Sequence, residues 1–221
     1  MTGYERPVID APQFHDADGA VIEYGARWAG SPPEDSYSVD THPERFAPLH
    51  AVAEALTEHL RTEFDVRVDE GAEVAADLLR PVGREVLRAV RLRPRDSTCA
   101  SLTFVFDDYP GLAVHSGLLH DAYFPHCGCD ACDEEWRAVA DDLERDVFAV
   151  VAGGFRERIA RGGELPVEYA LSYPDGSASG SFRLEDVPAH RLDAARTVLD
   201  ALPDGWAPWP RRAPRGIGAR R

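Results

Sequence analysis

The chain has 221 residues and a formal net charge of −15, with 39 acidic against 24 basic side chains. This length suffices for a hydrophobic core without covalent cross-links, and a hydrophobic fraction of 44% is ordinary for a globular protein. An acidic surface repels phosphate backbones and anionic bilayers, so we expect neither nucleic acid nor a membrane as a partner.

Every basic residue is an arginine, and the sequence contains no lysine. This excludes Schiff-base enzymes, P-loop NTPases and protein kinases, because each of them uses a lysine. No apolar run approaches the roughly 20 residues of a membrane-spanning helix. The first residues also lack the basic and then apolar pattern of a secretory signal. We therefore expect a cytoplasmic protein with reduced cysteines.

In chain order, residues 1–42 are predicted to form an N-terminal arm rich in Pro, Gly and Asp, with a hairpin turn at 15–19. Residues 43–201 are predicted to form the core. Residues 202–221 carry two tryptophans, which we expect to pack on the body, and an arginine-rich tail, which we expect to be disordered. No linker interrupts this order, so a single domain over 1–221 is expected.

Helical periodicity appears in four segments. Apolar residues recur at spacings of three and four over 44–64 and 133–160, and more weakly over 73–79 and 188–201. The stripe of the second long helix runs from Trp136 to Val151, which predicts that this helix packs in the core.

Strand patterns lie between the predicted helices. Residues 86–92, 99–106 and 112–116 alternate and are joined by short turns, which predicts an antiparallel meander. Residues 167–173 and 181–184 predict a hairpin. The expected fold is α+β, with an antiparallel sheet of meander plus hairpin packed against two or three helices.

A compact cluster of thiols is the most informative motif. Cys127 and Cys129 are two residues apart, so in an extended chain their side chains point to the same side. Cys132 follows after a further turn, at the spacing of a zinc knuckle, and Gly128 lets the backbone fold closely between two ligands. The motif therefore predicts a structural zinc site. Asp130 or Asp133 is predicted to cap the helix that follows.

Three thiolates leave one position of a tetrahedral zinc site to fill. We rank His120 first as the fourth ligand, because the intervening loop is long enough to fold back. His126 comes second, since neighbours on an extended chain point apart, and Cys99 third, since it is expected on a strand. Buried thiols without metal, redox thiols and an iron–sulfur cluster remain alternatives.

The signatures of familiar enzymes fail on inspection. Cys129 and Cys132 have the spacing of a zinc deaminase motif, but Gly128 stands where that motif needs proline, and His115-Ser116-Gly117 has no Glu in the required place. Residues 115–121 hold a Ser/His/Asp set, although such triads rarely assemble from one short segment.

Several motifs together resemble an uncharacterised family of proteins from high-GC bacteria of the actinobacterial type. The resemblance runs from Tyr4 to Trp209 and implies no activity. Its motifs are Tyr24-Gly25, Arg27-Trp28, Ser31-Pro32-Pro33-Glu34, Tyr37-Ser38-Val39, Pro43-Glu44-Arg45-Phe46, Tyr109-Pro110-Gly111, Phe124-Pro125 and Cys127-Gly128-Cys129-Asp130-Ala131-Cys132-Asp133-Glu134.

The sequence thus favours a binding or scaffolding protein with structural zinc, whose partner is a protein or small molecule. The alternative is a small-molecule enzyme that uses Cys129 or Cys132, with His120 and Asp121 near its site. Three protein ligands plus water would favour the enzyme, and four protein ligands would favour a structural site.

Overall fold

The structure is a computed structural model that describes residues 3–160, 166–183, 187–202 and 204–213. Within these residues, one antiparallel sheet has five strands in chain order: β1 (Val66–Glu70), β2 (Val86–Pro94), β3 (Leu102–Asp107), β4 (Leu112–Ser116) and β5 (His120–Phe124). A second antiparallel sheet comprises β6 (Phe155–Ile159), β7 (Pro166–Tyr173) and β8 (Gly176–Arg183). The helices are α1 (Pro48–Glu63), α2 (Trp136–Val151) and α3 (Ala189–Leu199), with 3-10 turns η1 (Glu34–Ser36), η2 (Pro43–Phe46) and η3 (Ala72–Asp77).

The predicted α+β fold with a meander and a hairpin is confirmed. The meander is β2–β4, and the hairpin is β7–β8. The sequence patterns missed β1, β5 and β6, which extend the two sheets. β1 and β5 are short and rich in polar residues, and their burial does not follow a strict alternation, so they lack the usual strand signature.

Two predicted helices differ from the structure, one in where it ends and the other in its type. The helix expected over 133–160 is α2 and ends at Val151, because Gly153 adopts a positive φ of 76° and the chain then enters β6. The short helix expected over 73–79 is the 3-10 turn η3.

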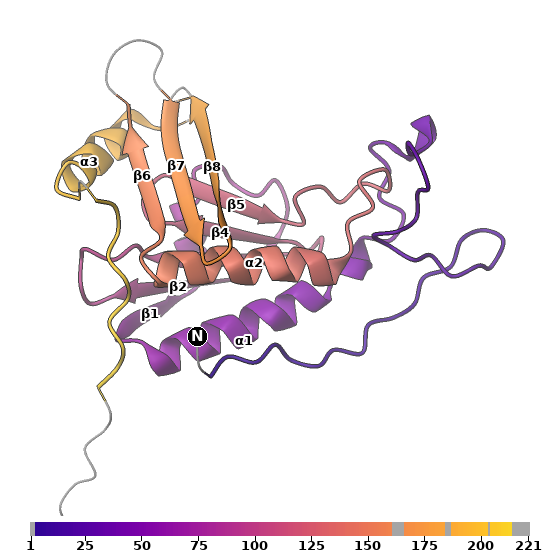
Figure 1. Cartoon of the computed structure of the whole chain (residues 1–221), viewed down its shortest axis with the longest axis horizontal. Helices are drawn as coiled ribbons and strands as arrows, with labels where there is room; N and C mark the ends of the chain where they lie inside the picture. The colour runs from indigo at the N-terminus through magenta and orange to yellow at the C-terminus, as the bar shows by residue number, and fades with distance from the viewer. Residues whose placement is uncertain (1–2, 161–165, 184–186, 203, 214–221) are drawn as a thin grey trace, which may run out of the picture.

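The two faces of the first sheet bury different side chains. Phe104 and Phe106 of β3 join the main core with α1 and α2, which lie together on one face (Figure 1). Val105, between them in sequence, points to the other face and packs with Val74 of η3. Both faces of β3 are therefore covered, which explains a strand whose residues are all buried.

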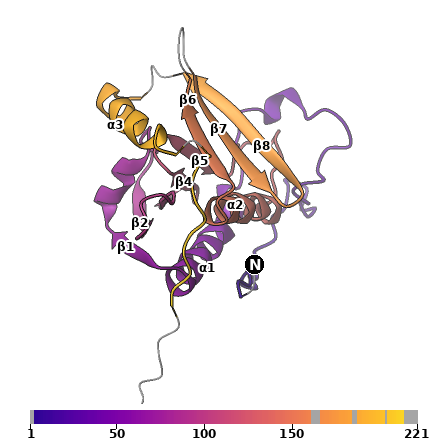
Figure 2. The same cartoon turned by 60° about the vertical axis from the view of Figure 1, so that its left-hand side comes forward.

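The second sheet contacts α2 through β7, and α3 lies beside β6 (Figures 1 and 2). Phe155 of β6 and Leu171 of β7 extend the main core. Trp206 and Trp209 are only 6% and 4% exposed, as expected for tryptophans that pack on the body. The tail expected to be disordered lies outside the described residues from 214 onward.

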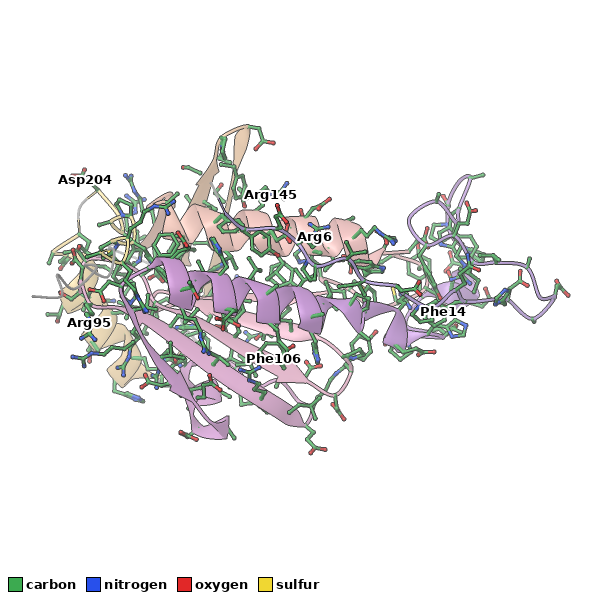
Figure 3. All side chains as sticks on the ribbon, turned by 90° about the horizontal axis from the view of Figure 1, so that it is seen from below. Arg6, Phe14, Arg95, Phe106, Arg145 and Asp204 are labelled. Carbon is green, nitrogen blue, oxygen red and sulfur yellow. The ribbon has the colours of Figure 1, made fainter. Side chains whose placement is uncertain are left out.

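The N-terminal arm runs along α2 and on to the far end of the molecule. Arg6 pairs with Glu144 of α2 at 2.7 Å, and Figure 3 shows Phe14 at the end opposite Arg95. His15 and Val21 form an antiparallel bridge, which confirms the predicted hairpin turn. No helix in the described part of the chain has both the length and the apolarity needed to cross a membrane.

Candidate metal centre

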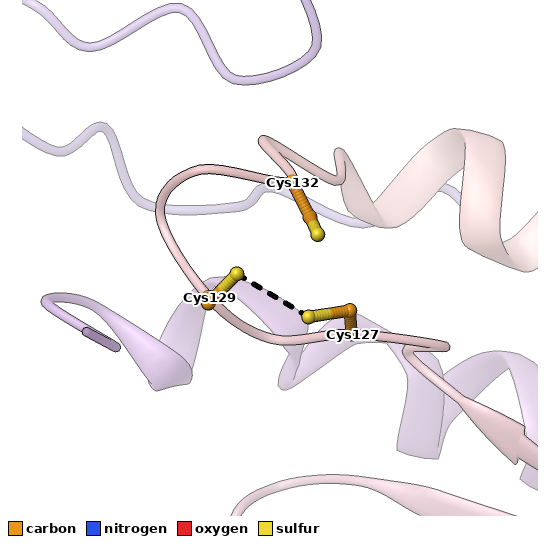
Figure 4. A group of neighbouring side chains, drawn as sticks. All are labelled: Cys127, Cys129 and Cys132. Carbon is orange, nitrogen blue, oxygen red and sulfur yellow. Dashed lines mark hydrogen bonds between the residues drawn. The ribbon is translucent and has the colours of Figure 1, made fainter. Parts of the chain in front are cut away.

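The three cysteines of the predicted site lie in the thiol loop, residues 125–135, which joins β5 to α2. Their sulfur atoms all lie within 4.8 Å of one another, and those of Cys127 and Cys129 are 3.3 Å apart (Figure 4). Cys129 is buried, Cys127 is partly buried and Cys132 is exposed. Three sulfur atoms converging on one point have the chemistry that a soft or borderline cation such as zinc requires.

Side chains within the thiol loop fix its conformation. The carboxylate of Glu134 accepts a hydrogen bond from the backbone N–H of Cys127 at 3.0 Å. The carboxylate of Glu135 accepts from the backbone N–H groups of Arg137 and Ala138, so Glu135 caps α2. The predicted cap, Asp130 or Asp133, was therefore wrong.

Asp130 instead ties the thiol loop to the preceding chain. Its carboxylate accepts a hydrogen bond from the backbone N–H of Thr41 at 3.2 Å and also contacts the Thr41 hydroxyl. The guanidinium groups of Arg27 and Arg45 lie 3.6 and 3.8 Å from it. Asp130 and Arg45 are 4% and 3% exposed, so this charge cluster is shielded from water.

Backbone hydrogen bonds reinforce the same contact. The N–H of Asp130 donates to the carbonyl of Val39 at 2.7 Å, and that of Ala131 donates to Ser36 at 3.0 Å. Arg45 also donates to the carbonyl of Gly128, between two of the cysteines, at 2.7 Å. Residues 36–45 are thus bound directly to the thiol loop.

The thiols influence one another's protonation. The backbone N–H of Cys132 lowers the pKa of the Cys129 thiol to about 7. The neighbouring thiols of Cys127 and Cys129 raise the pKa of Cys132 to about 12. The shift of Cys132 arises chiefly from hydrogen bonds to the other two thiols, and a bound cation would replace those shared protons, because metal binding releases protons from thiol ligands.

The structure does not bring His120 to the thiols. His120 begins β5 and its ring lies 4.1 Å from that of Tyr169, whereas the thiol loop starts after Phe124 at the other end of β5. Four residues of strand span about 13 Å. Burial also lowers the pKa of His120 to about 4, so it is a neutral ring in an aromatic environment.

The other two predicted ligands have different partners. Nε2 of His126 lies 3.6 Å from the Asp142 carboxylate, and its side chain is half exposed. The thiol of Cys99 donates to the carbonyl of Pro208 at 3.3 Å. Among the described residues, the converging group consists of the three thiols, so the fourth ligand stays a prediction.

The local Ser/His/Asp set does not assemble as a triad. Nδ1 of His115 lies 2.6 Å from the Asp121 carboxylate, and both belong to one cross-strand pair. Ser116 is the next residue of β4, so its side chain points to the opposite face of the sheet. Asp121 also accepts a hydrogen bond from the backbone N–H of Leu79, so the pair helps to hold that segment against the sheet.

Sequence reasoning missed the role of Arg27, Thr41 and Arg45, which surround Asp130. No spacing rule connects residues about ninety positions apart. The available signal was an acidic residue, Asp130, inside the cysteine motif. An acidic side chain that becomes buried there needs a partner from elsewhere in the chain.

The fold and the three thiols define an α+β protein with a candidate metal site. The chain belongs to a family of unknown function, DUF6226, whose model matches residues 10–213. No curated protein and no solved structure matches the chain.

Proposed function

We propose that this protein is a zinc-dependent binding or scaffolding protein of the cytoplasm. The observation that carries the proposal is the convergence of the thiols of Cys127, Cys129 and Cys132 within 4.8 Å. Reduced thiols at this spacing suit a reducing compartment and a thiolate-bound metal. The partner is a protein or small molecule, because the acidic chain disfavours nucleic acid and anionic membranes.

The metal has a structural role in this proposal. It holds the thiol loop in the conformation that presents Asp130 and the Gly128 carbonyl to the arm and to Arg45. Zinc binding contributes on the order of 10 kcal/mol where it is coupled to folding. The main core lies on the sheet and helices, so losing zinc loosens the loop and residues 36–45 without unfolding the chain.

Elemental analysis of four variants tests the proposal. Cys127→Ser, Cys129→Ser and Cys132→Ser should each lose zinc, because each removes one thiolate from the converging group. Cys99→Ser is the matched control: it removes a buried thiol elsewhere and should retain about one zinc per chain. Metal-free wild-type protein, purified under reducing conditions without chelator, would contradict the proposal.

Hydrogen exchange measures the structural role separately. Exchange over residues 36–45 should speed up in Cys129→Ser and in Asp130→Asn, which keeps the thiols but loses the charge that Arg27 and Arg45 contact. Asp141→Asn is the control, because that side chain on α2 is 70% exposed. Unchanged exchange in Cys129→Ser would rule out a metal that orders this segment.

The alternative function is a small-molecule enzyme that uses the thiols or their metal. Its support is that the described residues supply three converging ligands, which would leave one position of a tetrahedral metal for water or a substrate. A metal that keeps one exchangeable water in the purified protein would favour this alternative over a closed structural site.

A further inference from the structure

A pocket adjoins the thiol loop and shares residues with it. Its volume is about 460 Å³, within the range of small-molecule sites. Cys127 and Gly128 form one side of it. Tyr109 and Tyr123 supply aromatic walls, and Arg84 supplies a positive charge.

The pocket and the thiol loop are in tight contact at Gly128. A Cβ added there would lie 1.7 Å from the hydroxyl oxygen of Tyr109, so only glycine leaves room for the ring. Tyr109 thereby connects the pocket wall to the segment between Cys127 and Cys129. Any movement of the thiol loop must move one wall of the pocket.

The charges of the pocket favour an anionic ligand that carries an apolar group. Arg84 stacks on the Tyr109 ring at 3.7 Å from the centroid, and its side chain is exposed to solvent at the pocket. Oδ1 of Asp107 accepts hydrogen bonds from the backbone N–H groups of Tyr109 and Gly111 at 3.0 and 2.7 Å, so this carboxylate is engaged within its own turn. Asp40 is the remaining carboxylate, and burial and Asp40 together raise the pKa of Tyr109, which keeps that hydroxyl protonated.

We infer that this pocket binds a small organic carboxylate, held by Arg84 and the tyrosine rings, and that binding is coupled to metal occupancy of the thiols. The carboxylate accepts from the guanidinium of Arg84, and the apolar part of the ligand packs on Tyr109 and Tyr123. The coupling rests on the proposed zinc site, because the metal holds Cys127 and Gly128 in the pocket wall. Zinc and carboxylate therefore strengthen each other's binding reciprocally.

Calorimetric titration of the zinc-loaded protein with benzoate tests the pocket. Benzamide, the uncharged analogue of the same shape, is the matched control ligand and should bind at least about tenfold more weakly, because it lacks the charged acceptor. Arg84→Gln should lower benzoate affinity about tenfold. Arg67→Gln, which changes an exposed arginine of β1, should leave it unchanged.

Zinc content and melting temperature are measured first for each variant, and Arg84 is exposed, so both should stay at wild-type values. Equal binding of benzoate and benzamide, or unchanged affinity in Arg84→Gln, overturns the pocket assignment. Benzoate affinity that is the same with and without zinc overturns the coupling. Wild-type protein that purifies without zinc defeats the proposed metal site itself, whereas zinc-loaded protein that ignores benzoate defeats only this inference.

Discussion

At the scale of single residues, Glu157 is a buried carboxyl group that joins three segments of the chain. Its carboxylate lies on β6 and accepts hydrogen bonds from the backbone N–H groups of Leu118 and Leu119, at 2.9 and 2.8 Å, and from the indole of Trp206. It thereby joins the second sheet to the β4–β5 turn and to the C-terminal segment. Burial raises the pKa of Glu157 to about 7 despite these donors.

This raised pKa makes stability depend on pH. Because the folded state binds the Glu157 proton more tightly than the unfolded state, the free energy of unfolding should fall as pH rises from about 4.5 to 7, by on the order of 3 kcal/mol. His120 acts oppositely: its lowered pKa means that stability is lost as pH falls from about 6.5 to 4.

The difference between wild type and Glu157→Gln isolates the glutamate. Urea unfolding at several pH values should show that the wild type loses stability relative to this variant as pH rises through the stated window. Glu168→Gln, at an ion-paired position on β7 whose side chain is 40% exposed, is the control. A constant difference across the pH range would mean that folding does not raise the pKa of Glu157.

At the scale of elements, α2 has two functions. Its N-terminus, capped by Glu135, fixes the end of the thiol loop, and its buried face fills the core between α1 and the second sheet. Leu143, in the middle of this face, is completely buried. The helix thus connects the candidate metal centre to the main hydrophobic core.

Truncating the first residue of that face measures this connection. Trp136 is 7% exposed, so Trp136→Ala should lower the free energy of unfolding by about 3–5 kcal/mol through lost burial and a cavity. Arg137→Ala, one residue on and facing solvent, should change it by less than about 0.5 kcal/mol. Equal melting curves for Trp136→Ala and the wild type would show that this end of α2 does not support the core.

At the scale of the whole molecule, charge determines which partners are disfavoured. A net charge of −15 opposes association with a polyanion, so we expect no binding of duplex DNA tighter than about 1 μM near physiological salt. Fluorescence anisotropy would measure it. Deleting residues 211–221 tests the arginine-rich tail: weak binding that disappears with the tail agrees with the expectation, whereas submicromolar binding by the full chain contradicts it.

Local pattern was sufficient for the parts of the fold with strong periodicity. The stripe from Trp136 to Val151 predicted α2, because one face of that helix is buried, and the alternation over 86–92 predicted β2, whose Val90 and Leu92 join the main core. β1 escaped prediction because its five residues are mostly polar and lack a strict alternation of burial, and β6 because the helix expected over 133–160 was extended across it. Local pattern alone does not fix where one element ends and the next begins.

By itself, the sequence determined the fold class, the two-residue and three-residue spacing of the thiols and the acidic character of the chain, because these follow from composition and local geometry. Only the tertiary structure decided what surrounds the thiols. It placed His120 at the far end of β5 against Tyr169, and it brought Thr41 and Arg45 to Asp130. These contacts join segments far apart in the chain, and packing of the whole core selects them.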